Sequence, residues 1–161
     1  MCNPSTVGII ADTHGWFDPK IPKLFSQVDH ILHAGDFGSL EVINNLELVA
    51  PIIAVRGNVD RDRSQRKFLP QRYIQLFNTT ILLIHILGNP HSLSKDVLKS
   101  VSENNPQVVV FGHSHMPFLK KINNILYFNP GSAGPKRFNL PRTIGFLEFF
   151  PGDVKGRIIN L

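Results

Sequence analysis

The stretch VVVFGHSHMP, residues 108–117, joins a core strand to a set of reactive side chains. Its first four residues are β-branched or aromatic, which predicts a buried strand. Gly112 ends this run, and His113 and His115 follow it within three positions, although the whole chain has only 7 histidines. The stretch therefore predicts a strand that delivers two imidazole groups to one end of a β-sheet.

Four earlier segments follow the same plan, in which a short apolar run ends in polar or ionisable residues. These segments are residues 6–12, 30–36, 51–58 and 79–85. Each is short and rich in Val and Ile, which is typical of strands buried in a sheet. The chain is therefore expected to form a sheet whose strands carry polar groups at their carboxyl ends.

Three segments between the strands are typical of amphipathic helices: residues 20–27, 39–48 and 92–105. The last opens with a serine as a candidate cap and would place four apolar side chains on one face: Leu93, Val97, Leu98 and Val101. After residue 116 the pattern changes to antiparallel strands, with a turn at Asn123 and Asn124 and further strands at 143–150 and 156–161. This order predicts an α/β fold in a single domain, residues 1–161.

The composition is that of a globular protein, with 42% hydrophobic and 18% charged residues. No apolar run approaches the roughly 20 residues that span a bilayer, and no signal-type segment begins the chain. One cysteine, Cys2, is compatible with a reducing compartment, so a cytoplasmic protein without a membrane partner is expected.

The net charge of +5 favours anionic partners, such as nucleic acids or phosphorylated metabolites. The densest basic stretch is residues 61–67, and Lys136 and Arg137 form a second basic pair. These charges are either solvated on loops or help to hold a substrate phosphate, and the sequence leaves both interpretations open.

Polar side chains from five strand ends would meet, because ligands bind at the carboxyl ends of strands in open α/β sheets. The residues concerned are Asp12, His14, Asp36, Asn58, Asp60, His85, His113 and His115. Each could serve alone as a helix cap or a structural histidine, but that interpretation requires five independent coincidences. Neighbouring glycines suit a close approach of the backbone to a ligand: Gly35, Gly57 and Gly112.

The residue types point to metal ions. Imidazole suits zinc, iron or manganese, whereas carboxylate and amide oxygens favour harder divalent ions. Because the set contains no cysteine, a structural thiolate zinc site is excluded. The set is too large for one ion and fits two ions that share a ligand. Two metals about 3.5–4 Å apart activate a water molecule and hold a phosphoryl group, so the pattern predicts hydrolysis of a phosphate ester.

The ordered motifs DTH, GD, GNVD, a strand-final His85 and GHSH resemble those of the calcineurin-like metallophosphoesterases. The chain length and NPGS at 129–132 are most similar to the short bacterial and archaeal phosphodiesterase branch. The resemblance implies two packed mixed β-sheets flanked by helices, an αββα sandwich. It also implies a metal-dependent phosphodiesterase or phosphatase with two divalent ions, manganese being favoured and zinc, iron, nickel and magnesium also suitable.

The resemblance also implies the roles of the individual residues. Asp12, His14 and His115 would hold one ion. Asn58, His85 and His113 would hold the other, and Asp36 would bridge the two. A turn after Gly112 is needed for His113 and His115 to serve different ions. The residues expected to contribute to catalysis are Asp36, Asn58, Asp60 and His113, with Asp60 orienting a metal ligand or a group that faces the substrate.

Two positions depart from the family pattern. Many relatives have His where this chain has Val59, a position at which the short branch often has Cys. That His is thought to protonate the leaving group or hold the phosphate. Many relatives also have His-Gly-His where this chain has His85, Ile86 and Leu87. Weaker catalysis or a narrower substrate range is therefore expected.

Two alternatives to the enzyme remain open. One is a protein-binding scaffold of the same fold, similar to a retromer sorting subunit, with weak or no catalysis. The other is a nuclease, which the basic composition favours. Homo-oligomers are compatible with either. His33 is expected to be packed or to support a ligand, while His91, Trp16 and Phe17 are weaker candidates for contact with the substrate.

Overall fold

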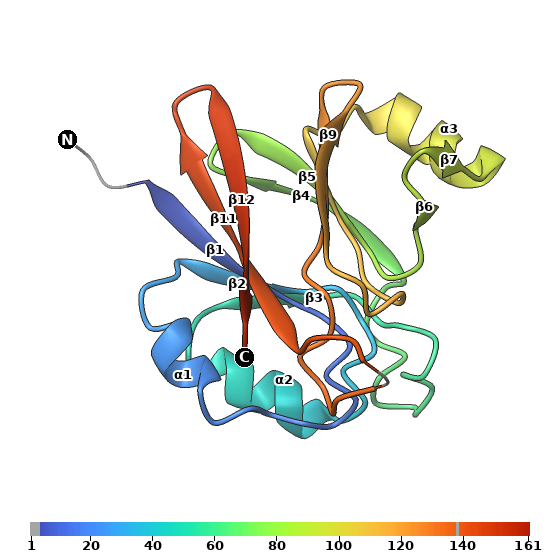
Figure 1. Ribbon diagram of the computed structural model, residues 1–161. Helices are drawn as coiled ribbons and strands as arrows, with labels where there is room; N and C mark the ends of the chain where they lie inside the picture. Colours follow the sequence, from blue (N-terminus) through green and yellow to red (C-terminus); the bar gives the residue numbers. More distant parts are fainter. Residues whose placement is uncertain (1–3, 138) are drawn as a thin grey trace.

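The computed structural model describes residues 4–137 and 139–161. Cys2 lies outside these residues. Two five-stranded sheets pack face to face, with helices on their outer sides (Figure 1). The first sheet has the order β12 (Asp153–Asn160), β11 (Thr143–Phe150), β1 (Ser5–Ile10), β2 (His30–His33) and β3 (Ile52–Ala54). The second has the order β4 (Gln71–Leu76), β5 (Thr79–Ile84), β8 (Val108–Val110), β10 (Ile125–Asn129) and β9 (Phe118–Ile122).

The remaining elements cover the sheets or connect their strands. They are α1 (Ile21–Leu24), α2 (Leu40–Glu47), α3 (Lys95–Asn104) and a small hairpin of β6 (Gly88–Asn89) and β7 (Ser92–Leu93). In Figure 1, α1 and α2 lie against the first sheet and α3 lies beside the second. The predicted αββα sandwich is confirmed.

Side-chain alternation divides the core into three layers. Val7 and Ile9 of β1 lie in the central layer, between the sheets. Ile10 packs on the opposite face, in the cluster that contains Phe25 and Leu46 from the helical side. A third cluster joins the outer face of the second sheet to α3. Both faces of each sheet are therefore covered, which is why the central strands are continuous apolar runs.

The topology explains why the strand ends meet. Strands β1, β2 and β3 run parallel in the first sheet, and β5, β8 and β10 run parallel in the second. Parallel strands place their carboxyl ends along the same edge of a sheet. Five of these six strands end just before a predicted site residue, so the sheets together frame one polar region.

Three details differ from the sequence-based expectations. The helix expected at 92–105 begins only at Lys95, because Ser94 caps it and Ser92 belongs to β7. Leu98 is 54% exposed and does not share the buried face. Strand β4 was not predicted, because its sequence QRYIQL does not alternate strictly between apolar and polar residues. It pairs with β5 through a tight turn at Phe77 and Asn78.

The antiparallel strands of the last third form the expected hairpins but do not form a sheet of their own. The β9–β10 hairpin joins the second sheet, whereas β11 pairs with β1 in the first. The turn at Asn123 and Asn124 is confirmed, with φ values of 47° and 69°. The pairing of strands within a hairpin could therefore be predicted from the turn residues. Which sheet each hairpin joins depends on contacts between residues distant in the sequence.

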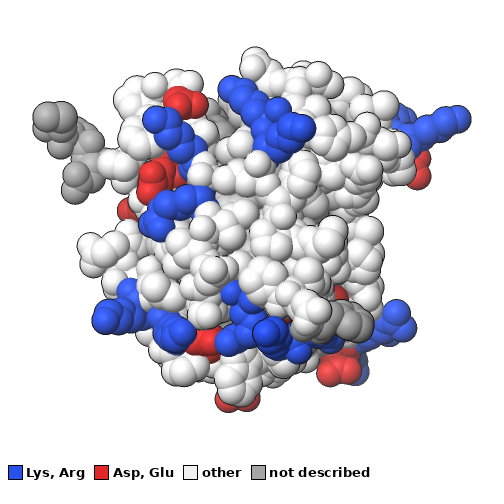
Figure 2. Space-filling model, viewed as in Figure 1, with Lys and Arg blue, Asp and Glu red and all other residues white. Residues whose placement is uncertain are grey.

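Within the described ranges, no helix combines the length and apolar character needed to cross a membrane. Lys and Arg side chains on the face in Figure 2 form several separate groups with acidic side chains among them. No single basic band covers this face. On this face, the positive charge is therefore divided among several groups.

Candidate metal centre

The backbone at the strand ends adopts a conformation that ordinary residues avoid. Five predicted ligands have left-handed φ values between 47° and 71°: Asp12, His14, Asp36, His113 and His115. Non-glycine residues in this region are uncommon and cost free energy, and they gather at functional sites. The left-handed turns at His113 and His115 also interrupt the alternation of an extended strand. These two side chains can therefore join different groups.

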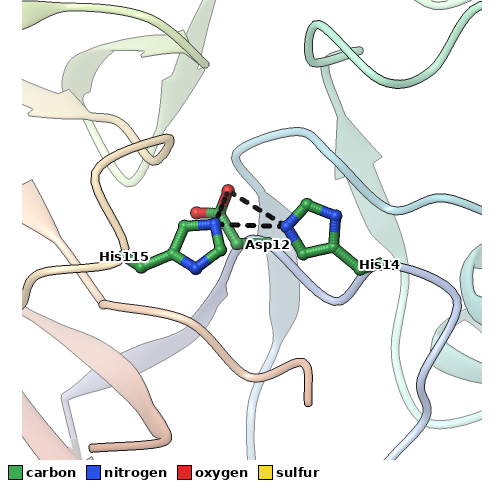
Figure 3. A group of neighbouring side chains, drawn as sticks. All are labelled: Asp12, His14 and His115. Carbon is green, nitrogen blue, oxygen red and sulfur yellow. Dashed lines mark hydrogen bonds and ion pairs between the residues drawn. The ribbon is translucent and has the colours of Figure 1, made fainter. Parts of the chain in front are cut away.

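Asp12, His14 and His115 form the first group (Figure 3). Asp12 and His14 come from the segment after β1, while His115 comes from the loop after β8. The Nε2 atoms of His14 and His115 lie 3.1 Å apart, and Asp12 Oδ1 lies 3.9 Å from the first and 3.3 Å from the second. Three potential ligand atoms therefore converge on one position.

Asp12 gives a direct test of whether this group suits a cation. Its carboxylate is fully buried, and Oδ2 accepts a hydrogen bond from the amide of His113 at 3.0 Å. Oδ1 is also buried but has no hydrogen-bond partner among the described residues. A buried, unsatisfied carboxylate oxygen is costly unless it is paired with a cation or a donor. The donor set therefore fits a divalent ion.

Asp36, His85 and His113 form the second group. His85 Nε2 lies 3.3 Å from Asp36 Oδ2 and 3.1 Å from the side-chain oxygen of Asn58. His113 Nδ1 lies 3.0 Å from the same Asn58 oxygen. Segments after β2, β3, β5 and β8 therefore bring together two imidazoles, a carboxylate and an amide oxygen.

Hydrogen bonds orient these ligands before any ion binds. His85 Nδ1 lies 2.7 Å from the carbonyl oxygen of Ala34, which requires Nδ1 to carry the proton. Nε2 is then the nitrogen available for coordination, an arrangement common among metal-binding histidines. The amide of Val59 donates to Asp36 Oδ1 at 2.9 Å, which leaves Oδ2 facing His85.

Asp36 belongs to the second group, and its charge also acts on the first. Burial alone would raise the pKa of the Asp36 carboxyl, but its contacts with His85 and the Val59 amide, together with the charges of His85 and His14, hold it below its ordinary value. Asp36 is therefore ionised near neutral pH. Its negative charge acts on histidines of both groups.

The histidines respond in opposite directions. Burial and the charge of Arg137 lower the pKa of His14, although Asp12 and Asp36 oppose them. Burial would also lower the pKa of His85, but the hydrogen bond to Asp36 and the charge of Asp12 raise it above the ordinary value. A cation that binds Nε2 of His85 therefore has to displace a proton there.

The glycines predicted to allow a close approach of the backbone do so. A Cβ on Gly35 would lie 2.7 Å from Nδ1 of His85, and one on Gly112 would lie 2.9 Å from Oδ2 of Asp12. A Cβ on Gly57 would collide with the Asp36 carboxylate. Even alanine at these positions would displace a ligand side chain.

Asp60 lies at the site but is bonded to the backbone. Its buried carboxylate accepts hydrogen bonds from the amides of Phe37, Gly38 and Gly57 at 3.3, 2.8 and 2.8 Å. These amides follow Asp36 and precede Asn58. Asp60 therefore positions the segments that carry two predicted ligands.

Two residues of the NPGS motif support the site, although the sequence assigned them no role. Buried Asn129 donates from Nδ2 to the carbonyl oxygen of Gly112 at 2.9 Å and to Ser114 Oγ at 3.1 Å. It thus holds the loop that carries the two histidines. Ser132 donates to the carbonyl oxygen of Asp12 at 2.9 Å. The signal was the motif itself, but only the fold shows what the residues hold.

A cavity of about 280 Å³ adjoins the second group, with Asn58 and His85 in its lining. Arg56 also lines it, and the Nε atom of Arg56 is buried without a hydrogen-bond partner among the described residues. The cavity therefore has a guanidinium-bearing residue in its lining beside Asn58 and His85. No role was predicted for Arg56 from the sequence.

The remaining aromatic and histidine candidates differ in burial and in their contacts. His33 is fully buried: its Nδ1 accepts from the amide of Gly35 and its Nε2 lies 2.9 Å from Thr13 Oγ1, so the expected packed role is confirmed. His91 is exposed near Phe118. Phe17 packs against a core cluster, whereas Trp16 is 48% exposed.

Sequence comparison agrees with the site. A family model described as the calcineurin-like phosphoesterase superfamily domain matches residues 6–150. The chain belongs to this superfamily. The resemblance inferred from its motifs is confirmed, and as a calcineurin-like phosphoesterase the protein is a metal-dependent hydrolase of phosphate esters.

Similar proteins occur in archaea. The chain is 30% identical over 141 residues to a probable metallophosphoesterase of Methanothermobacter thermautotrophicus, covering 84% of this chain and 81% of that protein. It is also 30% identical to a phosphodiesterase of Methanocaldococcus jannaschii, covering 88% and 92% of the two chains.

Among solved structures, an archaeal phosphodiesterase superposes with a TM-score of 0.75 at 26% identity, covering 96% of this chain and 99% of that one. Vacuolar protein sorting 29 from Cryptosporidium parvum superposes with a TM-score of 0.74 at 16% identity over 99% of each chain. The second likeness shows a shared fold.

Proposed function

We propose that this calcineurin-like phosphoesterase hydrolyses phosphodiesters at a site that holds two divalent ions. The observation that carries the proposal is the convergence of two ligand groups at one edge of the sandwich. Asp12, His14 and His115 would hold one ion. Asn58, His85 and His113 would hold the other, with Asp36 shared between them. The phosphodiesterase relatives from archaea support this substrate class.

The bound ions would supply an activated water molecule and positive charge for the phosphoryl oxygens. The chain itself contributes orientation. The amide of Val59 and the imidazole of His85 fix the Asp36 carboxylate, and Ala34 fixes the tautomer of His85. Asn58 lies between two imidazoles and presents its oxygen to both. Asp60 contributes by holding the backbone on either side of these ligands.

The proposed site lacks a proton donor at one position. Val59 is 44% exposed next to Asn58, and its side chain cannot protonate a departing alkoxide. A general acid typically contributes about 10²–10⁴-fold to such a step. Esters whose leaving groups depart as stable anions should therefore be the best substrates.

Hydrolysis of bis(p-nitrophenyl) phosphate, measured together with metal content, tests the proposal. Purified protein should release nitrophenolate in the presence of Mn²⁺ and lose this activity on treatment with a chelator. Re-addition of Mn²⁺, Zn²⁺, Fe²⁺, Ni²⁺ or Mg²⁺ would rank the ions, and we propose manganese as the first. Absence of hydrolysis with every ion would contradict the proposal.

We propose that the chain forms one domain, that it acts in the cytoplasm and that it is compatible with a homo-oligomer. A nuclease activity also remains a prediction, and a single-stranded oligonucleotide in the same assay tests it. The likeness to vacuolar protein sorting 29 concerns the fold, so a scaffold role has no specific observation in its favour.

A further inference from the structure

We propose that the cavity beside the second ligand group is a subsite for one arm of the phosphodiester, and that Arg56 pairs there with an anionic group on that arm. The proposal rests on the proposed function and adds the chemical class of the arm. In this arrangement Ile86 contacts the carbon atoms of the arm, and the guanidinium of Arg56 binds a carboxylate or phosphate at its end.

The cavity shares its wall with two predicted metal ligands. Asn58 and His85 both line it, and the Nε2 atom of His85 lies 3.1 Å from the side-chain oxygen of Asn58. A substrate whose phosphate lies at these atoms therefore has the cavity directly beside it. The volume of about 280 Å³ lies just below the range of about 300–1,000 Å³ typical of small-molecule sites, so the cavity has room for one ester arm.

Backbone hydrogen bonds hold the segments that build the cavity. The amide of Arg56 donates to the carbonyl oxygen of Leu69 at 2.9 Å, which ties the segment after β3 to the residues that lead into β4. Gln71 of β4 is the antiparallel partner of Ile84 on β5. Because Arg56, Gln71 and Ile84 all line the cavity, these pairings fix its shape before a substrate binds.

Arg56 brings to this wall a positive charge that the fold leaves unpaired. It forms no ion pair with an acid among the described residues, and its Nε atom is buried there without a hydrogen-bond partner. An unpaired buried donor costs free energy, and a cation beside a centre for divalent ions adds repulsion. An anion bound to the guanidinium would offset both costs. Guanidinium groups bind carboxylates and phosphates through paired hydrogen bonds.

Ile86 gives the same cavity an exposed apolar surface. It follows His85 directly, lines the cavity and is 49% exposed. Pro70 and Ile84 add further apolar lining. An exposed apolar side chain contributes binding free energy when a ligand covers it, so this wall favours carbon atoms on the arm.

The combination selects the class of arm. An apolar wall alone would favour any hydrocarbon arm, and a guanidinium alone would favour any anion. A short carbon chain that ends in a carboxylate or a phosphate matches both, with the ester phosphate held at the ligand groups. Carboxylate and phosphate share this chemistry, so a test needs one arm of each kind.

Five p-nitrophenyl phosphodiesters that differ only in the retained arm test the subsite. The arms are methyl, propyl, 2-carbamoylethyl, 2-carboxyethyl and 2-phosphonoethyl. The carbamoyl and carboxyl arms have nearly the same shape, so the ratio of their kcat/KM values measures the preference for charge. In the wild type a charged arm should exceed the carbamoyl arm by about tenfold, as for a hydrogen bond to a charged group. Propyl should exceed methyl by about fourfold, as for burial of one methylene group.

Two variants separate the contributions of charge and apolar contact. Arg56→Gln should remove the preference for charged arms and keep the ratio of propyl to methyl. Ile86→Ala should lower that ratio about twofold and keep the preference for charge. Arg72→Gln is the matched control and should keep both preferences. It removes the same charge from an exposed residue that follows Gln71 on β4 and therefore lies on the opposite face of the strand.

Three results would overturn the subsite. The first is a wild type without preference for either charged arm over the carbamoyl arm, which requires no variant to fold. The second is an equal loss on all five esters in Arg56→Gln, because Arg56 would then act on the reacting phosphate or on folding. The third is an unchanged preference for charged arms in Arg56→Gln.

Calorimetric binding of two phosphonates gives a test that does not depend on hydrolysis. 4-Phosphonobutyrate has the chain length of the carboxyethyl ester arm, and butylphosphonate lacks only the carboxylate. Mn²⁺-loaded wild type should bind the first about tenfold more tightly, and Arg56→Gln should remove this difference. Equal affinities in the wild type, or a difference that persists in Arg56→Gln, would contradict the subsite. Absent hydrolysis of the methyl ester with every metal ion would instead contradict the proposed function.

Discussion

The two ends of the sandwich use the same left-handed backbone conformation in different ways. At the hairpin end, Phe77 and Asn78 connect β4 to β5, and Asn123 and Asn124 connect β9 to β10, all with positive φ. These residues are exposed and reverse the chain direction. Two-residue turns of this kind require positive φ at both positions, and the twist of the adjoining strands favours them.

At the ligand end, the left-handed residues do not form two-residue hairpins. Asp12, Asp36 and His115 are buried, and each presents a polar atom to another predicted ligand. Regular strand geometry would place two residues that are two positions apart, such as His113 and His115, on the same face. Their left-handed backbone instead directs the two side chains to different ligand groups. The comparison shows that one conformation serves connectivity at one end and the placement of ligands at the other.

Asp36→Asn should produce the largest effect at the ligand end. The variant keeps the shape of the side chain but removes the negative charge that acts on both groups. Hydrolysis of bis(p-nitrophenyl) phosphate should be abolished and metal content lowered, while far-ultraviolet circular dichroism stays unchanged. Asp96→Asn, an exposed position on α3, is the matched control and should keep full activity. Wild-type activity in Asp36→Asn would exclude Asp36 from the shared position.

Buried His33 should make the ligand end sensitive to acid in the metal-free protein. Burial lowers the pKa of His33 from 6.5 to about 3. Between these values the unfolded chain binds more protons than the folded one, so stability is lost as pH falls from about 6.5 towards 3. The difference of about 3.5 units corresponds to about 4–5 kcal/mol of unfolding free energy.

Urea unfolding between pH 7 and pH 4 measures the larger part of this loss, about 3 kcal/mol. His33→Gln should flatten the pH dependence, because glutamine does not titrate. His91→Gln is the matched control, since His91 is exposed, and should leave the slope as in the wild type. An unchanged slope in His33→Gln would show that another group dominates acid sensitivity.

Much of the fold and several residues of the candidate site could be predicted from local sequence patterns. Apolar runs ending in Asp, Asn or His revealed the strands and the candidate ligands, and Asn123 with Asn124 revealed a hairpin. Strand β4 was missed because it lies on an edge and its sequence QRYIQL does not alternate strictly between apolar and polar residues. Without that alternation, periodicity does not identify the segment as a strand.

The supporting contacts of the site could not be predicted in the same way. Asn129 and Ser132 belong to a visible motif, but their partners Gly112 and Asp12 are 17 and 120 residues away in the chain. Asp60 resembled a group that faces the ligands, whereas its recorded partners are backbone amides. Such pairings depend on the tertiary fold and leave no local pattern.

Val59→His, a change at the ligand end, should moderately raise the rate of hydrolysis of alkyl phosphodiesters. A histidine there could donate a proton to the departing oxygen, and Val59 is 44% exposed, which leaves room for a larger side chain. Rates for alkyl phosphodiesters should rise by about tenfold or more, within the range typical of general acids. Rates for nitrophenyl esters should change little, because nitrophenolate needs no proton to depart.

A series of phosphodiesters with increasing leaving-group pKa measures this effect. The wild type should show a steep fall in rate with leaving-group pKa, and Val59→His should show a shallower one. Ile86→His, at a second exposed position in the loop after β5, compares a histidine placed elsewhere near the site. A shallow dependence in the wild type, unchanged by Val59→His, would show that another donor already acts.

Asn124→Gly, a change at the hairpin end, should have the smallest effect: a small change in stability and none in hydrolysis. Its φ of 69° suits glycine, and Asn-Gly is the preferred pair for this turn. Stability should change by less than about 1 kcal/mol, in the stabilising direction, as in other turns where glycine relieves a left-handed residue. Thermal unfolding measures the change. Loss of hydrolysis in this variant would link the hairpin end to the site.

The count of bound ions tests the central claim most directly. Calorimetric titration of metal-free protein with Mn²⁺ should give two ions per chain in the wild type. His115→Ala removes a ligand from the first group and His85→Ala removes one from the second, so each variant should retain one tight site. A single ion in the wild type, or the loss of the same site in both variants, would contradict a centre built from two ligand groups.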